Sequence, residues 1–188
     1  PILLIAIFFI VNFIITNRQA THPIVHFHTL FSKKPFVGAT MAISSHLTLL
    51  TGIAGINVYI VRILKLPFDI SLHFYFFFFV GVIITGILKM FFYSSVGAGF
   101  LGTLGSSALL YVSIHWIILG NTINIPLLYI QGLLLGFGAS MTLVSGSMAT
   151  LLDGDLKEAA QRSQTMHTIR NFSAAMLIPI IAYTIRSE

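Results

Sequence analysis

Apolar runs long enough to cross a lipid bilayer fill most of the chain between Pro35 and Leu152, with short polar gaps between them. A transmembrane helix needs about 20 consecutive apolar residues, and these runs approach or exceed that length. Charged residues make up only 8% of the sequence and the mean hydropathy is +0.96. A water-soluble fold would therefore lack the polar side chains to cover its surface. The runs predict an all-α integral membrane protein.

We expect about six transmembrane helices, because five polar gaps divide the chain into six apolar segments. The strands of a membrane barrel would instead be short and would alternate in hydropathy, which these runs do not. The segments are expected at about 1–16, 36–62, 70–92, 98–119, 124–151 and 168–186.

Basic residues lie in the gaps and do not form one basic face, which argues against nucleic acid as a partner. Successive helices alternate in direction, and cytoplasmic gaps carry an excess of Lys and Arg. One side holds Arg18, Lys33, Lys34, Lys89, Lys157, Arg162 and Arg170, and the other holds Arg62, Lys65 and Arg186. This asymmetry predicts that the loops at 17–35, 89–97 and 152–167 are cytoplasmic, in the inner (plasma) membrane of the cell. Both chain ends would then lie outside, as expected for a piece of a larger protein.

The first long gap, 17–35, has an apolar stripe at helical spacing. Ile24, Phe27, Leu30 and Phe31 form this stripe, which is typical of an amphipathic helix in the membrane interface. Pro35 then fits the first turn of the following helix, where its missing N–H costs nothing.

Small residues form two stripes where helices are expected to pack closely, since helix association in lipid depends on close backbone approach. The stripes are Ala98, Gly102 and Ser106 in one segment, and Gly132, Gly136 and Ser140 in another. Plain helix packing is favoured over a moving surface for both.

Polar side chains at bilayer depth are costly, so each is a candidate functional group. His46 lies about ten residues into its segment, or roughly 15 Å from the cytoplasmic start, next to Ser45. Two interpretations of His46 are open: it contacts substrate or a proton, or it is a neutral side chain hydrogen-bonded to a neighbouring helix. Asn57 and Gln131 likewise have two interpretations: they line a polar path, or they tie two helices together.

Three further polar or aromatic residues are expected near the membrane surfaces. His115 and Trp116 are predicted to belong to an interfacial belt, and Lys89 is predicted to extend towards the headgroups.

Other features argue against an enzyme. The chain has no Cys, and none of its predicted spans contains Asp or Glu. No cluster has metal-ligand spacing, and no nucleotide-binding or hydrolase motif occurs. We therefore expect no catalytic residue, no metal and no cofactor. A membrane-embedded haem or redox protein and a non-transporting membrane scaffold remain alternatives.

Two stretches resemble the major facilitator superfamily, in its fourteen-span drug:proton antiporter branch. THPIVHFHTLFSKKPFVGA is similar to the cytoplasmic segment that precedes the carboxy-terminal six-helix half, through Pro23, Leu30, Phe31, Lys33, Lys34 and Phe36. QGLLLGFGASMTLVSGSMATL is similar to the glycine-rich fourth helix of that half, through Gly132, Gly136 and Gly138. Arg170 and Asn171 are similar to the polar start of the helix that follows it. The stretch after the third segment, LKMFFYSSVGAG, lacks the Asp and Arg of the related loop, so no charge-based latch is expected there.

The resemblance implies a transporter that works by alternating access and carries a small-molecule substrate, with proton-coupled efflux as one form. It divides the chain into the end of a linker helix (1–16), an amphipathic cytoplasmic linker (17–35) and five helices of a carboxy-terminal half (36–188). The last helix and the amino-terminal half of the same chain would be missing. The lipid bilayer, the substrate and protons are the expected partners.

Overall fold

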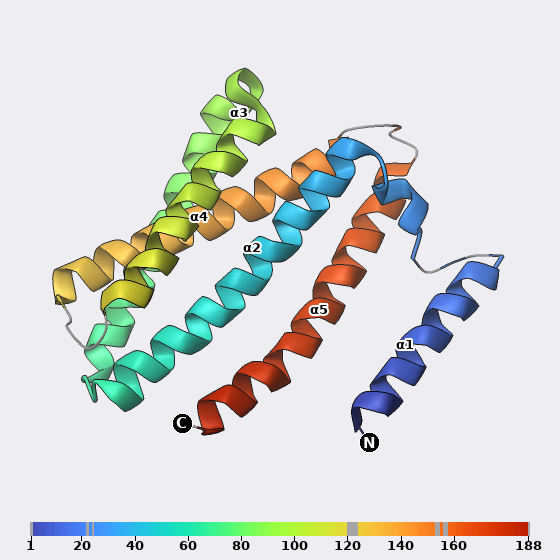
Figure 1. The fold of residues 1–188 in the computed structure, drawn as a ribbon. Helices are drawn as coiled ribbons and strands as arrows, with labels where there is room; N and C mark the ends of the chain where they lie inside the picture. Colours follow the sequence, from blue (N-terminus) through green and yellow to red (C-terminus); the bar gives the residue numbers. More distant parts are fainter. Residues whose placement is uncertain are drawn as a thin grey trace.

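In a computed structural model, long helices lie side by side in a bundle (Figure 1). The structure describes residues 2–21, 23, 25–119, 124–152, 155 and 158–187. Among these residues no strand occurs, so the predicted all-α class is confirmed. The elements are α1 (Ile2–Gln19), the 3-10 helix η1 (Phe27–Leu30), α2 (Lys33–Val58), the π-helix η2 (Tyr59–Ile63), α3 (Phe68–Leu119), α4 (Ile125–Leu152) and α5 (Ala159–Ser187).

Four helical stretches within the described residues are long and apolar enough to cross a membrane. These stretches are Lys33–Ile63, Phe68–Ile118, Ile125–Leu152 and Ala159–Arg186. They agree with the predicted membrane-embedded helical protein. Pro35 and Pro126 lie in the first turns of α2 and α4, where a proline costs no hydrogen bond.

Helix α3 is a hairpin of two antiparallel helices. Its 52 residues would extend about 78 Å as one straight helix, far more than the roughly 30 Å of a bilayer core. The chain reverses at Gly97, whose φ of 74° and ψ of 169° are not helical and favour glycine. The turn is visible at the top of Figure 1. The predicted loop at 89–97 is therefore wrong in extent, because 89–96 remain helical.

Two other predicted polar segments also differ from the structure. In place of the amphipathic helix predicted in 17–35, the structure has the four-residue 3-10 helix η1. Its last residue, Leu30, is buried, and the next residue, Phe31, is exposed. Ile24 lies outside the described residues. At the other gap, α5 begins at Ala159 and continues without a break through the predicted loop at 152–167.

Helix α4 lies at the centre of the bundle, between α2 and the two halves of α3 (Figure 1). Close packing with α3 depends on glycine at Gly81 and Gly136. A Cβ atom at Gly81 would collide with the carbonyl oxygen of Leu133, and one at Gly136 with that of Phe78. The predicted small stripe of α4 is thus a packing surface.

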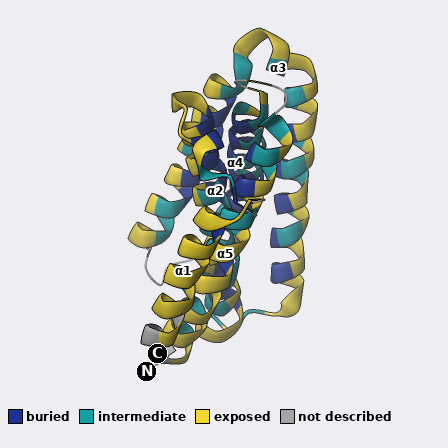
Figure 2. Ribbon diagram, turned by 90° about the vertical axis from the view of Figure 1, so that its right-hand side faces the viewer, coloured by how far each residue is buried: buried dark blue, intermediate teal, exposed yellow. Residues whose placement is uncertain are grey.

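Two apolar clusters lie at opposite ends of α2. One surrounds Ile56, Phe74 and Leu135, and the other joins Leu30 and Ala42 to Met166 of α5. Half of α5 is nevertheless exposed, as is most of α1 at the edge of the bundle (Figure 2).

Candidate functional site

His46 of α2 is half-buried, and α2 packs against α5, which carries the basic residues His167 and Arg170. His167 and Arg170 are three residues apart and therefore lie on one face of α5. His46 is 13 residues after Lys33, and Arg170 is 11 residues after Ala159. Because α2 and α5 run in the same direction (Figure 1), both lie at a similar depth, roughly 17–20 Å from the same end of the bundle.

Arg170 brings a positive charge into this interface with incomplete hydrogen bonding. Its side chain is partly accessible, but its Nε atom is buried and has no partner within the described part of the chain. A buried donor without a partner is costly. The basic cluster of His46, His167 and Arg170 is therefore equipped to hold an acceptor, such as water or a bound polar molecule.

Ser45, although next to His46 in sequence, points to a different helix. It is 2% exposed, and its Oγ donates to the carbonyl oxygen of Ala139 on α4 at 3.1 Å. Ser45 thus ties α2 to α4 and does not join the basic cluster.

Ser45 also lines an open groove of about 230 Å³ between α2, the second half of α3 and α4. Two of its hydroxyls are near each other, with Ser106 Oγ 3.5 Å from Thr142 Oγ1. Hydroxyl groups both donate and accept, so this groove offers polar surface at mid-helix depth. Its hydroxyl residues are Ser44, Ser45, Thr48, Ser106, Ser113 and Thr142.

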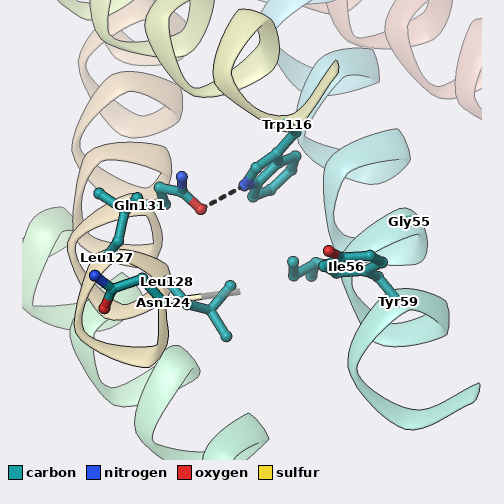
Figure 3. Close-up of a pocket in the computed structure, with 8 residues that line it drawn as sticks. All are labelled: Gly55, Ile56, Tyr59, Trp116, Asn124, Leu127, Leu128 and Gln131. Carbon is teal, nitrogen blue, oxygen red and sulfur yellow. Dashed lines mark hydrogen bonds between the residues drawn. The ribbon is translucent and has the colours of Figure 1, made fainter. Parts of the chain in front are cut away.

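Gln131 is buried near the opposite end of the bundle, where it connects α4 to the second half of α3. Its Oε1 accepts a hydrogen bond from Trp116 Nε1 at 2.7 Å, and its Nε2 lies 2.8 Å from His115 Nδ1. His115 and Trp116 were predicted as interfacial residues, but both point inward to this amide. A mostly apolar cavity of about 230 Å³ lies beside the pair. Figure 3 shows Gln131 on one side of it, Ile56 and Tyr59 on the other, and Trp116 above, between them.

Asn57 lies near the same end but is exposed. Its Oδ1 accepts a hydrogen bond from the hydroxyl of Tyr75 at 2.8 Å, which joins α2 to the first half of α3. Of the four predicted site residues, the structure therefore places Ser45, Asn57 and Gln131 in ties between helices and leaves His46 on a partly accessible face.

Lys89 has a role that the sequence did not predict. Its Nζ donates to the carbonyl oxygen of Met141 at 2.9 Å and approaches that of Ser140 at 3.5 Å. Instead of extending to the headgroups, Lys89 binds the middle of α4. Thr85, one turn earlier, similarly donates to the carbonyl oxygen of Phe137 at 3.1 Å.

The predicted small residues have mixed surroundings. A Cβ atom at Gly132 would meet the carbonyl oxygen of Phe74 at 2.8 Å, and one at Gly102 would collide with the side chain of Met41. Ala98 instead lines a cavity near the Gly97 turn.

The described residues contain no group of three or more His, Cys, Asp or Glu side chains that could hold a metal ion. Comparison of the chain with protein-family models, curated proteins and solved structures finds no significant match.

Proposed function

We propose that the chain belongs to a secondary active transporter, in which a small molecule crosses the membrane by alternating access. In this proposal the helices form part of a major facilitator fold, and the protein is not an enzyme. The observation that carries it is the set of partly accessible basic residues His46, His167 and Arg170, at mid-helix depth on the packed helices α2 and α5, with the Nε of Arg170 buried and without a partner in the described residues.

A charged side chain inside a bilayer is expensive unless it faces water, a partner or a ligand. Arg170 makes no ion pair in the described part of the chain, and the helices around it are apolar. A water-filled cavity on this face would provide the missing solvation. Transporters of this kind place their substrate sites near the middle of the membrane, where two bundles rock about a central cavity.

The packing of α5 also supports the proposal. Only 6% of its most apolar window is buried, compared with 50% in α4. A helix that packs so loosely within its own bundle has a large face left for a second bundle or for a cavity. His46 would be the proton-coupling residue on this face, because an imidazole gains or loses a proton near neutral pH.

Cysteine accessibility tests the proposal, because the chain has no native Cys to mask the label. The variant His46→Cys is expressed in cell membranes and treated with a charged thiol reagent that cannot cross lipid. The reagent is applied separately to right-side-out and inside-out vesicles. Alternating access predicts that the introduced thiol is labelled from both sides.

The matched control is Ile83→Cys on α3, since Ile83 is 61% exposed on an apolar helix and should face lipid. It should be labelled from neither side. Labelling of His46→Cys from neither side, or from one side alone, would contradict the proposal.

A further inference from the structure

The largest of the described cavities lies at the basic end of the bundle, away from the His46 cluster. Its volume is about 430 Å³, and it opens between the first turns of α2, the end of α4 and the Gly97 turn of α3. The residues that define its chemistry are Lys33, Lys34, Val37, Met41, Tyr93 and Met148.

One end of this cavity is positively charged. Lys33 and Lys34 are exposed at its rim, and no acidic residue belongs to its described lining. Both lysines also form the first turn of α2, where backbone N–H groups and the helix dipole favour an anion.

The rest of the cavity is apolar. Val37, 61% exposed, and Met41 follow the lysines along α2, and Met148 faces them from α4. Met41 is eight residues after Lys33, which corresponds to roughly 12 Å along the helix. The cavity therefore extends from a cationic rim to an apolar slot along the helix axis.

We propose that this cavity binds an anionic phospholipid, whose phosphate contacts Lys33 and Lys34 and whose acyl chain lies against Val37, Met41 and Met148. A free phosphate ion would leave the apolar slot empty, whereas a phospholipid matches both parts. The basic end is also the predicted cytoplasmic end, and the cytoplasmic leaflet is the one rich in anionic lipids. The inference does not depend on transport.

Lipid binding to the purified chain in neutral detergent tests this proposal. The probes are phosphatidylglycerol and phosphatidylcholine with identical acyl chains, and binding is measured by native mass spectrometry and by the shift of the unfolding temperature. Phosphatidylglycerol should bind and raise the unfolding temperature, and phosphatidylcholine should do neither. The double variant K33Q/K34Q should bind phosphatidylglycerol roughly thirtyfold more weakly.

The control R62Q/K65Q removes the same charge from exposed residues at the opposite end and should bind as the unchanged chain does. If K33Q/K34Q folds poorly, K33R/K34R provides the second test, because it keeps the charge and should keep the binding. Equal affinity of K33Q/K34Q and R62Q/K65Q would overturn the proposal. Full competition by inorganic phosphate would also overturn it and would indicate a free-anion site.

Discussion

Helices α4 and α5 show two different ways of placing polar groups in an apolar bundle. Around α4, polar side chains from other helices find backbone or amide partners, as Lys89 does at Met141 and Trp116 at Gln131. Along the α2–α5 interface, Arg170 has a buried donor without a partner. The α3–α4 region is therefore a scaffold held by these ties, although the hydroxyl groups of Ser71 and Ser145 are also buried there without a partner. The α2–α5 face instead leaves a donor of a charged side chain for solvent or a ligand. The variants below test this difference, and thermal unfolding in detergent, followed by the fluorescence of the one Trp, measures each.

The largest effect is expected for Arg162→Met, at the start of α5. Arg162 is 2% exposed, and it donates to the carbonyl oxygens of Thr150, Leu151 and Asp155 at 2.9–3.0 Å. Its loss leaves carbonyl oxygens at the end of α4 without partners, so we expect destabilisation by about 2–3 kcal/mol.

The partner Glu158 serves as the control for this variant. Its side chain is 46% exposed and lies 3.6 Å from that of Arg162, so Glu158→Gln should cost less than about 1 kcal/mol. If Glu158→Gln lowered the unfolding temperature as much as Arg162→Met, the ion pair and not the carbonyl contacts would hold α5 to α4.

A smaller loss is expected for Gly81→Ala in the α3–α4 interface. The added methyl group would collide with the backbone of Leu133, and overpacking of this kind costs roughly 1–3 kcal/mol. Gly86 of the same helix has no atom within 4 Å of the equivalent position. Gly86→Ala should therefore be neutral or stabilising by up to about 1 kcal/mol. Similar unfolding temperatures for the two variants would show that this interface is not closely packed.

The buried amide gives the next effect in size. Gln131→Leu removes the partners of Trp116 and His115, and hydrogen bonds between helices in membranes are worth about 1 kcal/mol. The emission of Trp116 should change in the same variant, because its Nε1 loses its acceptor. A double-mutant cycle with Trp116→Phe isolates the pair, with unfolding followed by circular dichroism in all four proteins because this variant has no Trp. A coupling energy of zero would contradict the contact.

The sequence allowed the helical class and most helix positions to be predicted, because the apolar lengths alone decide them. It did not predict the roles of Lys89, Trp116 and Arg162, whose partners are carbonyl or amide groups on another helix or across a turn. A basic residue near a polar gap looks the same in sequence whether it reaches water or a backbone oxygen. The extent of the turn at Gly97 was missed for a related reason, since the polar residues Ser94 and Ser95 continue the helix.

The candidate site was predicted only in part. His46 was identified from its depth, and the structure leaves it partly accessible as a functional residue requires. Arg170 was counted only as a cytoplasmic charge and as part of the resemblance to a transporter, because nothing in the sequence shows that α5 brings it beside α2. Ser45 was misplaced because neighbouring residues on a helix point about 100° apart, which directs it to α4.

The smallest stability effect, and the sharpest test of the comparison, is expected for Arg170→Met. Arg162 and Arg170 lie two turns apart on α5, but the Nε of Arg162 has a carbonyl partner and that of Arg170 has none. Removing Arg170 relieves an unpaired donor, so the free energy of unfolding should change by less than about 0.5 kcal/mol or should increase.

The same variant should abolish labelling of His46→Cys if the cavity needs this charge to stay hydrated. A loss of stability equal to that of Arg162→Met would show that both arginines are structural, and the α2–α5 face would then be no different from the α4 scaffold.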